Sequence, residues 1–185
     1  RMFAVEHAGV RPDLMCLGKG ITGGYLPLAA TLATESIFET FKAPYEDFKA
    51  FFHGHTFTGN ALACSVANAN LEIFARENVV ARVRERSARL SGLLGESIAS
   101  LPHVGDVRQS GLMVGIELVR DRERRSPYDP AERIGQRVCQ EIRRHGIILR
   151  PLGPVVILMP PLSVTEGELE TLVHSCAAAI RAVTE

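Results

Sequence analysis

The chain has 185 residues and a mass of 20.2 kDa, with 46% apolar, 23% charged and 6% aromatic residues, which is ordinary for a protein with a hydrophobic core. Lysine and arginine number 21, as do aspartate and glutamate, so the net charge is zero and binding to nucleic acid or anionic membranes through bulk charge is not expected. No stretch approaches the ~18 consecutive apolar residues of a membrane span, and the first residues lack a signal-peptide pattern. The composition predicts a soluble, globular, cytoplasmic protein.

The cysteines and histidines do not form a metal-binding pattern. There is no C-x-x-C pair and no cysteine has a histidine at ligand spacing. His53 and His55 lie two residues apart, but no third ligand follows at suitable spacing, so we expect loop packing or active-site lining rather than metal binding. Free, buried thiols are expected at Cys16, Cys64, Cys139 and Cys176.

The first part of the chain is expected to form short strands and loops. Residues 1–9 show no helix cap. Beyond them, short apolar runs flank a glycine-rich segment and predict two strands. In chain order, the expected elements are a strand at 13–17, a glycine cluster at 18–24, a strand at 27–33, a short helix at 34–41 and a loop-rich stretch at 43–59.

Helical periodicity begins at Asn60. Apolar spacing predicts one helix from there and a second from about 79 to 101, whose arginines alternate with glutamates and indicate a solvated surface rather than a nucleic-acid site. After Pro102 we expect strands at 104–108 and 112–119, a polar loop at 120–130, a helix around 134–142, strands at 147–150 and 155–159, and a last helix from Thr165, with Glu168 completing a capping box. This order predicts an α/β fold with a strand-and-loop part at 1–78 and a small α+β domain at 79–185.

The glycine cluster contains Lys19 and matches two phosphate-binding patterns only superficially. Residues 18–23 fit G-x-G-x-x-G, but Gly24, Tyr25 and Pro27 follow at once, so no helix can begin there to hold a pyrophosphate. A P-loop fails as well, because Asp13 stands where its first glycine should be. What remains is a lysine at the end of a strand, with glycines that allow another molecule to approach, which is a suitable setting for a lysine that bonds to an aldehyde.

Two segments resemble motifs of class III pyridoxal-phosphate aminotransferases. Residues 12–27 read PDLMCLGKGITGGYLP and are similar to the lysine segment of that class, and residues 52–64 read FHGHTFTGNALAC and are similar to its downstream phosphate-contact segment. Within the class, residues 103–109, 115–119 and 149–161 are most similar to members that aminate 8-amino-7-oxononanoate in biotin synthesis. The resemblance covers essentially the whole chain.

The resemblance implies a fold, a cofactor and roles for four residues. The fold would be the C-terminal part of a type I pyridoxal-phosphate large domain followed by the small C-terminal domain. Lys19 would form the Schiff base with pyridoxal 5′-phosphate and then shuttle a proton. Thr56 would contact the cofactor phosphate from the partner subunit of a homodimer, Arg150 would hold the carboxylate of the keto acid, and Tyr25 would line the substrate site.

The activity expected from the resemblance is amino transfer to 8-amino-7-oxononanoate, which gives 7,8-diaminononanoate. Two alternatives stay open: a class III transaminase acting on another ω-amino acid, and a non-catalytic, truncated dimerisation module. In members that resemble this chain, the amino donor is S-adenosylmethionine or lysine. The context of Arg150 in the run Arg-Pro-Leu-Gly favours the first activity.

The resemblance also implies that functional parts of the class lie outside this chain. In such aminotransferases the acid that pairs with the pyridine nitrogen, the ring that stacks on the cofactor and the glycine–serine phosphate loop all precede the region corresponding to Arg1. We therefore expect that the 185 residues alone are not a competent transaminase.

Overall fold

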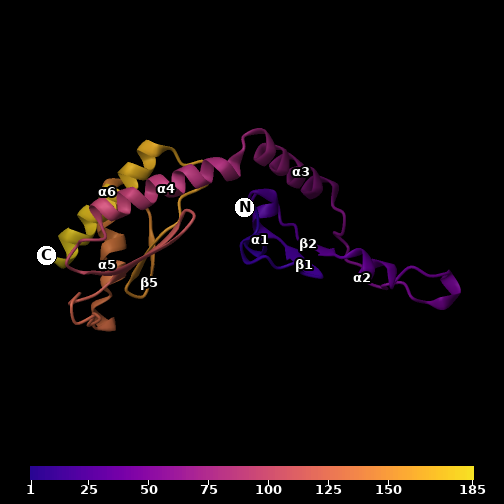
Figure 1. Ribbon diagram of the computed structural model, residues 1–185, viewed down its shortest axis with the longest axis horizontal. Coiled ribbons are helices and arrows are strands. Elements are labelled where there is room, and N and C mark those ends of the chain that lie inside the picture. The colour runs from indigo at the N-terminus through magenta and orange to yellow at the C-terminus, as the bar shows by residue number, and fades with distance from the viewer. The chain divides into compact units, whose positions relative to one another are not determined.

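Helices and short antiparallel strands make up the computed structural model, which describes residues 1–185 (Figure 1), and the prediction of an α/β fold is confirmed. The chain divides into two compact units, Arg1–Val80 and Ala81–Glu185. Each is described by itself below. None of the helices combines the length and the apolar character needed to cross a lipid bilayer.

The first unit is built on one pair of strands. β1 (Leu14–Leu17) pairs antiparallel with β2 (Ala30–Ala33), and the 3-10 turn η1 (Lys19–Thr22) follows β1. The second strand is shorter than the predicted 27–33, because its partner β1 ends at Leu17, which pairs with Ala30, and the chain then turns into η1. The glycine cluster contains only the short turn η1 and does not begin a long helix. This agrees with the prediction that the cluster does not bind phosphate as a dinucleotide-binding motif would.

Short helical segments and one long helix complete this unit. They are α1 (Ala4–Ala8), α2 (Glu35–Glu39), η2 (Tyr45–Asp47) and α3 (Ala61–Arg76). Residues 1–9 have no capping residue in the usual position, yet they form the short helix α1. The Glu6 carboxylate, inside the helix, accepts a hydrogen bond from the Phe3 N–H at 2.8 Å and caps its start. The predicted start of α3 is confirmed: the Asn60 side chain accepts a hydrogen bond from the Ala63 N–H at 3.0 Å.

The second unit has two layers, a sheet and the helices that cover one of its faces. The strands are β3 (Val104–Ser110), β4 (Met113–Leu118), β5 (Arg150–Leu152) and β6 (Val155–Leu158), all antiparallel in the order β3-β4-β6-β5. The helices are α4 (Val79–Ser97), which begins just before the unit boundary, α5 (Ile134–Glu141) with the turn η4 (Ile142–His145), and α6 (Glu166–Thr184), while the loop before α5 holds the turn η3 (Pro130–Glu132).

The core of the second unit lies between these layers. Every second residue of β4 and β6 is buried, Ile116 and Val156 among them, and meets the apolar faces of the helices. Helices α4 and α6 lie side by side (Figure 1), and ion pairs join Arg86 to Glu166 and Arg89 to Glu170. Two of the arginines interpreted as solvated helix surface therefore join neighbouring helices.

Two predicted boundaries in this unit are wrong. Helix α4 ends at Ser97 rather than near residue 101. The strand predicted at 147–150 lies at Arg150–Leu152 instead. The predicted strands at 147–150 and 155–159 leave Pro151 between them, but β5 is the edge strand of the sheet, where proline is tolerated, and Pro151 pairs with Val156.

The cysteines are free, as predicted, but they are not all buried. Cys139 and Cys176 lie in the core, and burial raises the pKa of the Cys176 thiol to about 12. Cys64 is half-buried. The prediction is wrong for Cys16, which is exposed because it lies on a two-stranded pair with nothing packed against that face.

Candidate active site

Lys19 lies immediately after β1, in a backbone conformation that is rare for a lysine. Gly18 is extended. Lys19 has a φ of +53°, in the left-handed region that residues other than glycine, asparagine and aspartate seldom adopt. Such a conformation costs roughly 1–2 kcal/mol and persists only where the surrounding contacts enforce it. A strained lysine at the end of a strand is a candidate functional residue.

Two polar side chains hold the turn that carries Lys19. Thr22 is 1% exposed and its hydroxyl donates to the Leu26 carbonyl oxygen at 2.5 Å. From α3, the Asn70 amide donates to the carbonyl oxygens of Gly20 and Ile21, both at 3.1 Å. Sequence reasoning missed both anchors, although an asparagine in the middle of a helix is a usable signal for a tertiary hydrogen bond.

The Lys19 turn borders a hollow of about 670 Å³. Its walls come from the segment before β2 and the loop before α3, namely Lys19, Leu26, Pro27, Leu28, Ala29, His55, Phe57, Thr58 and Gly59. This volume is in the range typical of small-molecule sites, and the lining combines apolar side chains with a few polar groups. Within the first unit, the structure therefore brings the two predicted motifs, 12–27 and 52–64, to one hollow.

The other residues predicted in this region are placed differently from Lys19. Thr56 lies between His55 and Phe57, which line the hollow, but does not line it itself. Tyr25 is 82% exposed and is not among the lining residues either. His55 lines the hollow, as one of the two readings of the histidine pair predicts, and its Nδ1 accepts from the Phe57 N–H at 3.2 Å.

Arg150 lies in the second unit, on the face of the sheet that the helices do not cover. The register places Arg108, Gly115, Ile157 and Arg150 in one row across β3, β4, β6 and β5. Their strand neighbours in β4 and β6 point into the core, so this row faces outward. Three strand spacings separate the two arginines, which amounts to about 14 Å.

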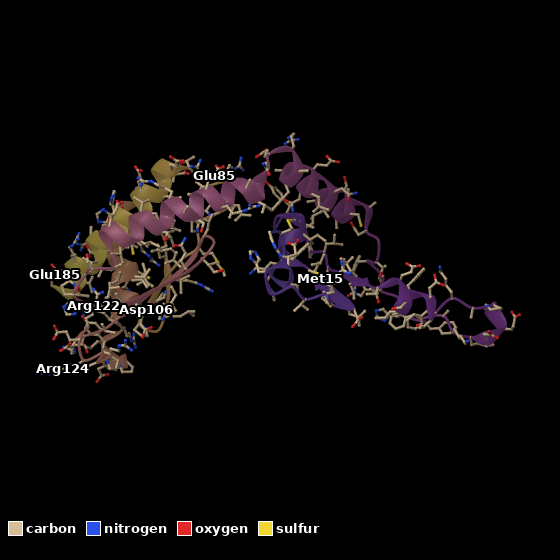
Figure 2. The ribbon with its side chains drawn as sticks, viewed as in Figure 1. Met15, Glu85, Asp106, Arg122, Arg124 and Glu185 are labelled. Carbon is tan, nitrogen blue, oxygen red and sulfur yellow. The ribbon has the colours of Figure 1, made fainter.

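The two arginines of this row have opposite surroundings. Arg108 donates hydrogen bonds to Asp106 at 2.9 Å (Asp106 is labelled in Figure 2) and to Glu117 at 2.6 Å. The bond to Glu117, followed by the bond to Asp106, raises the pKa of the Arg108 guanidinium. Arg150 is exposed and forms no ion pair. Arg108 is therefore already neutralised, whereas Arg150 presents an uncompensated, planar donor group to an anion.

Comparison with known proteins places the chain in a family. Residues 1–180 match the profile of the family described as Aminotransferase class-III. The chain therefore belongs to the class III aminotransferases, and its resemblance to that class is confirmed.

The most informative relatives carry one name. The chain is 61% identical over 184 residues to the adenosylmethionine-8-amino-7-oxononanoate aminotransferase of Nitratidesulfovibrio vulgaris, and 49% identical over 185 residues to that of Anoxybacillus flavithermus. All of the chain is covered in both alignments, but it spans only 34% and 40% of those relatives. This share agrees with the expectation that the chain corresponds to part of a longer family member.

Solved transaminase structures share the fold. The adenosylmethionine-8-amino-7-oxononanoate aminotransferase of Methanocaldococcus jannaschii superposes with a TM-score of 0.85 at 46% identity, covering 97% of this chain and 40% of that one. An (S)-enantioselective omega-transaminase from Thermomicrobium roseum superposes with a TM-score of 0.86 at 33% identity, covering 100% of this chain and 40% of that one. The fold is thus common to members with different substrates, so it does not by itself define the substrate.

Proposed function

We propose that this chain supplies the lysine-bearing and carboxylate-binding parts of a cytoplasmic, pyridoxal-phosphate-dependent aminotransferase acting on 8-amino-7-oxononanoate. The observation that carries the proposal is Lys19, held with a φ of +53° beside a 670 Å³ hollow where two class III motifs meet. The names of the relatives at 46–61% identity support the substrate. An ω-amino-acid transaminase is the alternative within the family; the named omega-transaminase is less similar, at 33%.

The residues around the hollow suit pyridoxal 5′-phosphate. The hollow has room for a small aromatic molecule, with an exposed lysine amine and a histidine among largely apolar walls. When bound, this cofactor supplies an aldehyde for the lysine and a ring that accepts electrons from the substrate carbon. Lys19 would hold it covalently.

The chain's own groups then have distinct tasks. The Lys19 amine would release the cofactor to the incoming amine and move a proton between the two carbon atoms that exchange it. Thr22 and Asn70 would keep the lysine in place through their bonds to its turn. Arg150 would hold the keto-acid carboxylate with paired N–H donors, and Tyr25 would line the substrate site from its exposed position.

A homodimer is part of this proposal. Thr56 is next to the lining of the hollow without belonging to it, as expected of a threonine that serves the site of a partner subunit. The segment between α2 and α3 also exposes five phenylalanines and a tyrosine: Phe41, Tyr45, Phe48, Phe51, Phe52 and Phe57. Exposed apolar surface of this extent is typical of an interface.

Complementation between two inactive variants tests the shared site. Lys19→Ala and Thr56→Ala should each lose most of their activity, since each removes one component from every site. Co-expression should restore activity, because a mixed dimer joins the Lys19 of one chain to the Thr56 of the other. A mixture as inactive as its components would show that both residues serve the same subunit's site.

Borohydride trapping tests the proposed chemistry directly. The natively expressed protein is reduced with borohydride in the presence of pyridoxal phosphate and mapped by mass spectrometry, with Lys49→Ala as the matched control. We expect the cofactor adduct on Lys19, its loss in Lys19→Ala, and its retention in the control. A native protein without any adduct would contradict the aminotransferase proposal.

Turnover assays with different substrates separate the alternatives. We expect the 185-residue chain by itself to show no turnover, because the acid that pairs with the pyridine nitrogen is expected elsewhere. Amination of 8-amino-7-oxononanoate by the native protein supports the proposed substrate, whereas turnover of only other ω-amino acids with pyruvate or 2-oxoglutarate supports the alternative. Absence of both activities would favour a non-catalytic module.

A further inference from the structure

The hairpin that carries Arg150 rests on the start of helix α5. Strands β5 and β6 are joined by Gly153 and Pro154 alone, and Gly153 has a φ of +57°. A positive φ at the first loop residue followed by proline matches the pattern of a tight type II′ turn, which fixes the register of the hairpin. Arg150 therefore moves with this turn rather than independently of it.

Gly135, near the start of α5, lies directly against the hairpin. It is buried, and a Cβ atom added to it would lie 2.3 Å from the Gly153 carbonyl oxygen and 3.0 Å from the Pro151 Cβ. Pro151 points toward α5, on the core side of the sheet, whereas Arg150 faces outward on the opposite side. Helix α5 thus supports from behind the strand that presents the arginine in front.

Space, rather than backbone conformation, accounts for glycine at this position. Gly135 lies within the regular α5 helix and has no positive φ. In the interior of a helix, propensity alone favours alanine over glycine by about 1 kcal/mol. Other helical glycines, such as Gly95 in α4, have nothing within 4 Å of the added Cβ, so the need for a bare Cα arises from the hairpin.

From this contact we infer that Gly135 is a positioning residue for the substrate carboxylate, acting through the backbone of the β5–β6 turn on Arg150. The inference rests on the proposed role of Arg150. A methyl group at Gly135 must push the turn away by about 1 Å before the contact becomes ordinary. The displacement tilts the edge strand and with it the guanidinium, while the Lys19 hollow, built from other residues, is unaffected.

The test compares Gly135→Ala with the parent in the natively expressed protein, loaded with pyridoxal phosphate. The substrates are 8-amino-7-oxononanoate and its methyl ester, which lacks the negative charge that Arg150 would bind. We expect KM for the acid to rise between about 10-fold and 100-fold with kcat nearly unchanged, since ångström-scale misplacement of a binding group has effects of this size. The KM for the ester should change less than about twofold.

Two further variants make the outcomes distinguishable. Gly95→Ala is the matched control and should leave both KM values unchanged, because its added methyl group meets nothing. Arg150→Gln should abolish the preference for the acid over the ester. A parent that does not prefer the acid over the ester, or an Arg150→Gln variant that keeps the parent's preference for the acid, would overturn the role of Arg150 and this inference with it. An intact preference in the parent, with Gly135→Ala behaving as the parent, would overturn the inference about Gly135 alone.

A variant that relieves the contact covers the case in which Gly135→Ala does not fold. Pro151→Gly removes the side-chain carbon that faces Gly135 and leaves Arg150 in the sequence. It loosens the hairpin against α5, so KM for the acid should again rise more than KM for the ester. Equal changes for the two substrates would show a general structural effect and contradict the positioning role.

Discussion

The two units of this chain differ in how many of their apolar side chains are buried. In the second unit, 24 buried residues between Leu90 and Ile180 form one continuous core. In the first, Thr22, Ala63, Ala67 and Val79 are the buried residues, and this unit contributes 17 of the 22 large apolar side chains that are exposed. The second unit therefore has a core of its own, whereas the first presents apolar surface that further polypeptide would cover.

The difference follows the division of labour proposed for the site. The lysine turn and the phosphate-contact loop lie in the unit without a core, so their geometry depends on a few polar anchors such as Thr22 and Asn70. Arg150 lies on a sheet whose other face is fully packed. The residue proposed to bind the substrate thus lies in a unit with its own core, and the residues proposed to bind the cofactor lie in a unit whose apolar side chains are mostly exposed.

Matched apolar truncations sharpen this comparison and have the largest expected effect on stability. Ile116→Ala removes a side chain that is 0% exposed at the centre of β4 and should lower the free energy of unfolding by about 2–5 kcal/mol. Leu32→Ala in β2, 52% exposed, should change it by less than about 0.5 kcal/mol in the 185-residue chain. Urea denaturation followed by circular dichroism measures both.

Measuring Ile116→Ala and Leu32→Ala in the natively expressed protein tests whether the difference between the two units persists there. If further polypeptide covers β2 there, Leu32→Ala becomes costly, by more than about 1 kcal/mol. The cost of Ile116→Ala stays as it was in the shorter chain. An unchanged, negligible cost of Leu32→Ala in the native protein would mean that this surface stays exposed and that the first unit is not completed in the way we propose.

Much of the second unit could be predicted from its sequence pattern, because its helices and strands bury their apolar faces against one another. Strand-like apolar runs predicted β4 and β6, and the Thr165–Glu168 pair located the start of α6. The β5 strand was misplaced because the pattern does not reveal that it would be an edge strand, where Pro151 can pair. In α1, the cap comes from Glu6 inside the helix rather than from the residue before it.

The candidate site was predictable only where its residues belong to motifs. Lys19 stands out by its glycines and by the resemblance of its segment. Asn70 and Gly135 act on segments that are distant in sequence: Asn70 bonds to carbonyls 49 and 50 residues away, and Gly135 fits against the β5–β6 turn. Contacts of this kind depend on the tertiary arrangement, and a single sequence offers only the indirect signal of a residue that is unfavourable in its own helix.

The smallest predicted effect concerns the cap of α6, a local device within the self-sufficient unit. The Thr165 hydroxyl accepts from the Glu168 N–H at 3.3 Å, and the Glu168 carboxylate accepts from the Thr165 N–H at 2.7 Å and from its hydroxyl at 2.8 Å. Thr165→Ala should lower the free energy of unfolding by about 1 kcal/mol. Because the partners touch, the combination with Glu168→Gln should cost less than the sum of the two single variants.

The pH dependence of this cap has a definite sign. The backbone N–H of Thr165, followed by its hydroxyl, lowers the pKa of the Glu168 carboxyl below its ordinary value of 4.5. A carboxyl with a lowered pKa in the folded state stabilises the fold above its unfolded-state pKa, and this contribution is lost as the pH falls through the folded-state value. The stability difference between the parent and Glu168→Gln should therefore be constant near neutral pH and shrink progressively below about pH 4.5. Thermal unfolding midpoints recorded from pH 7 to pH 3 measure it, and a difference that persists unchanged at pH 3 would mean that the carboxylate charge does not contribute to the cap.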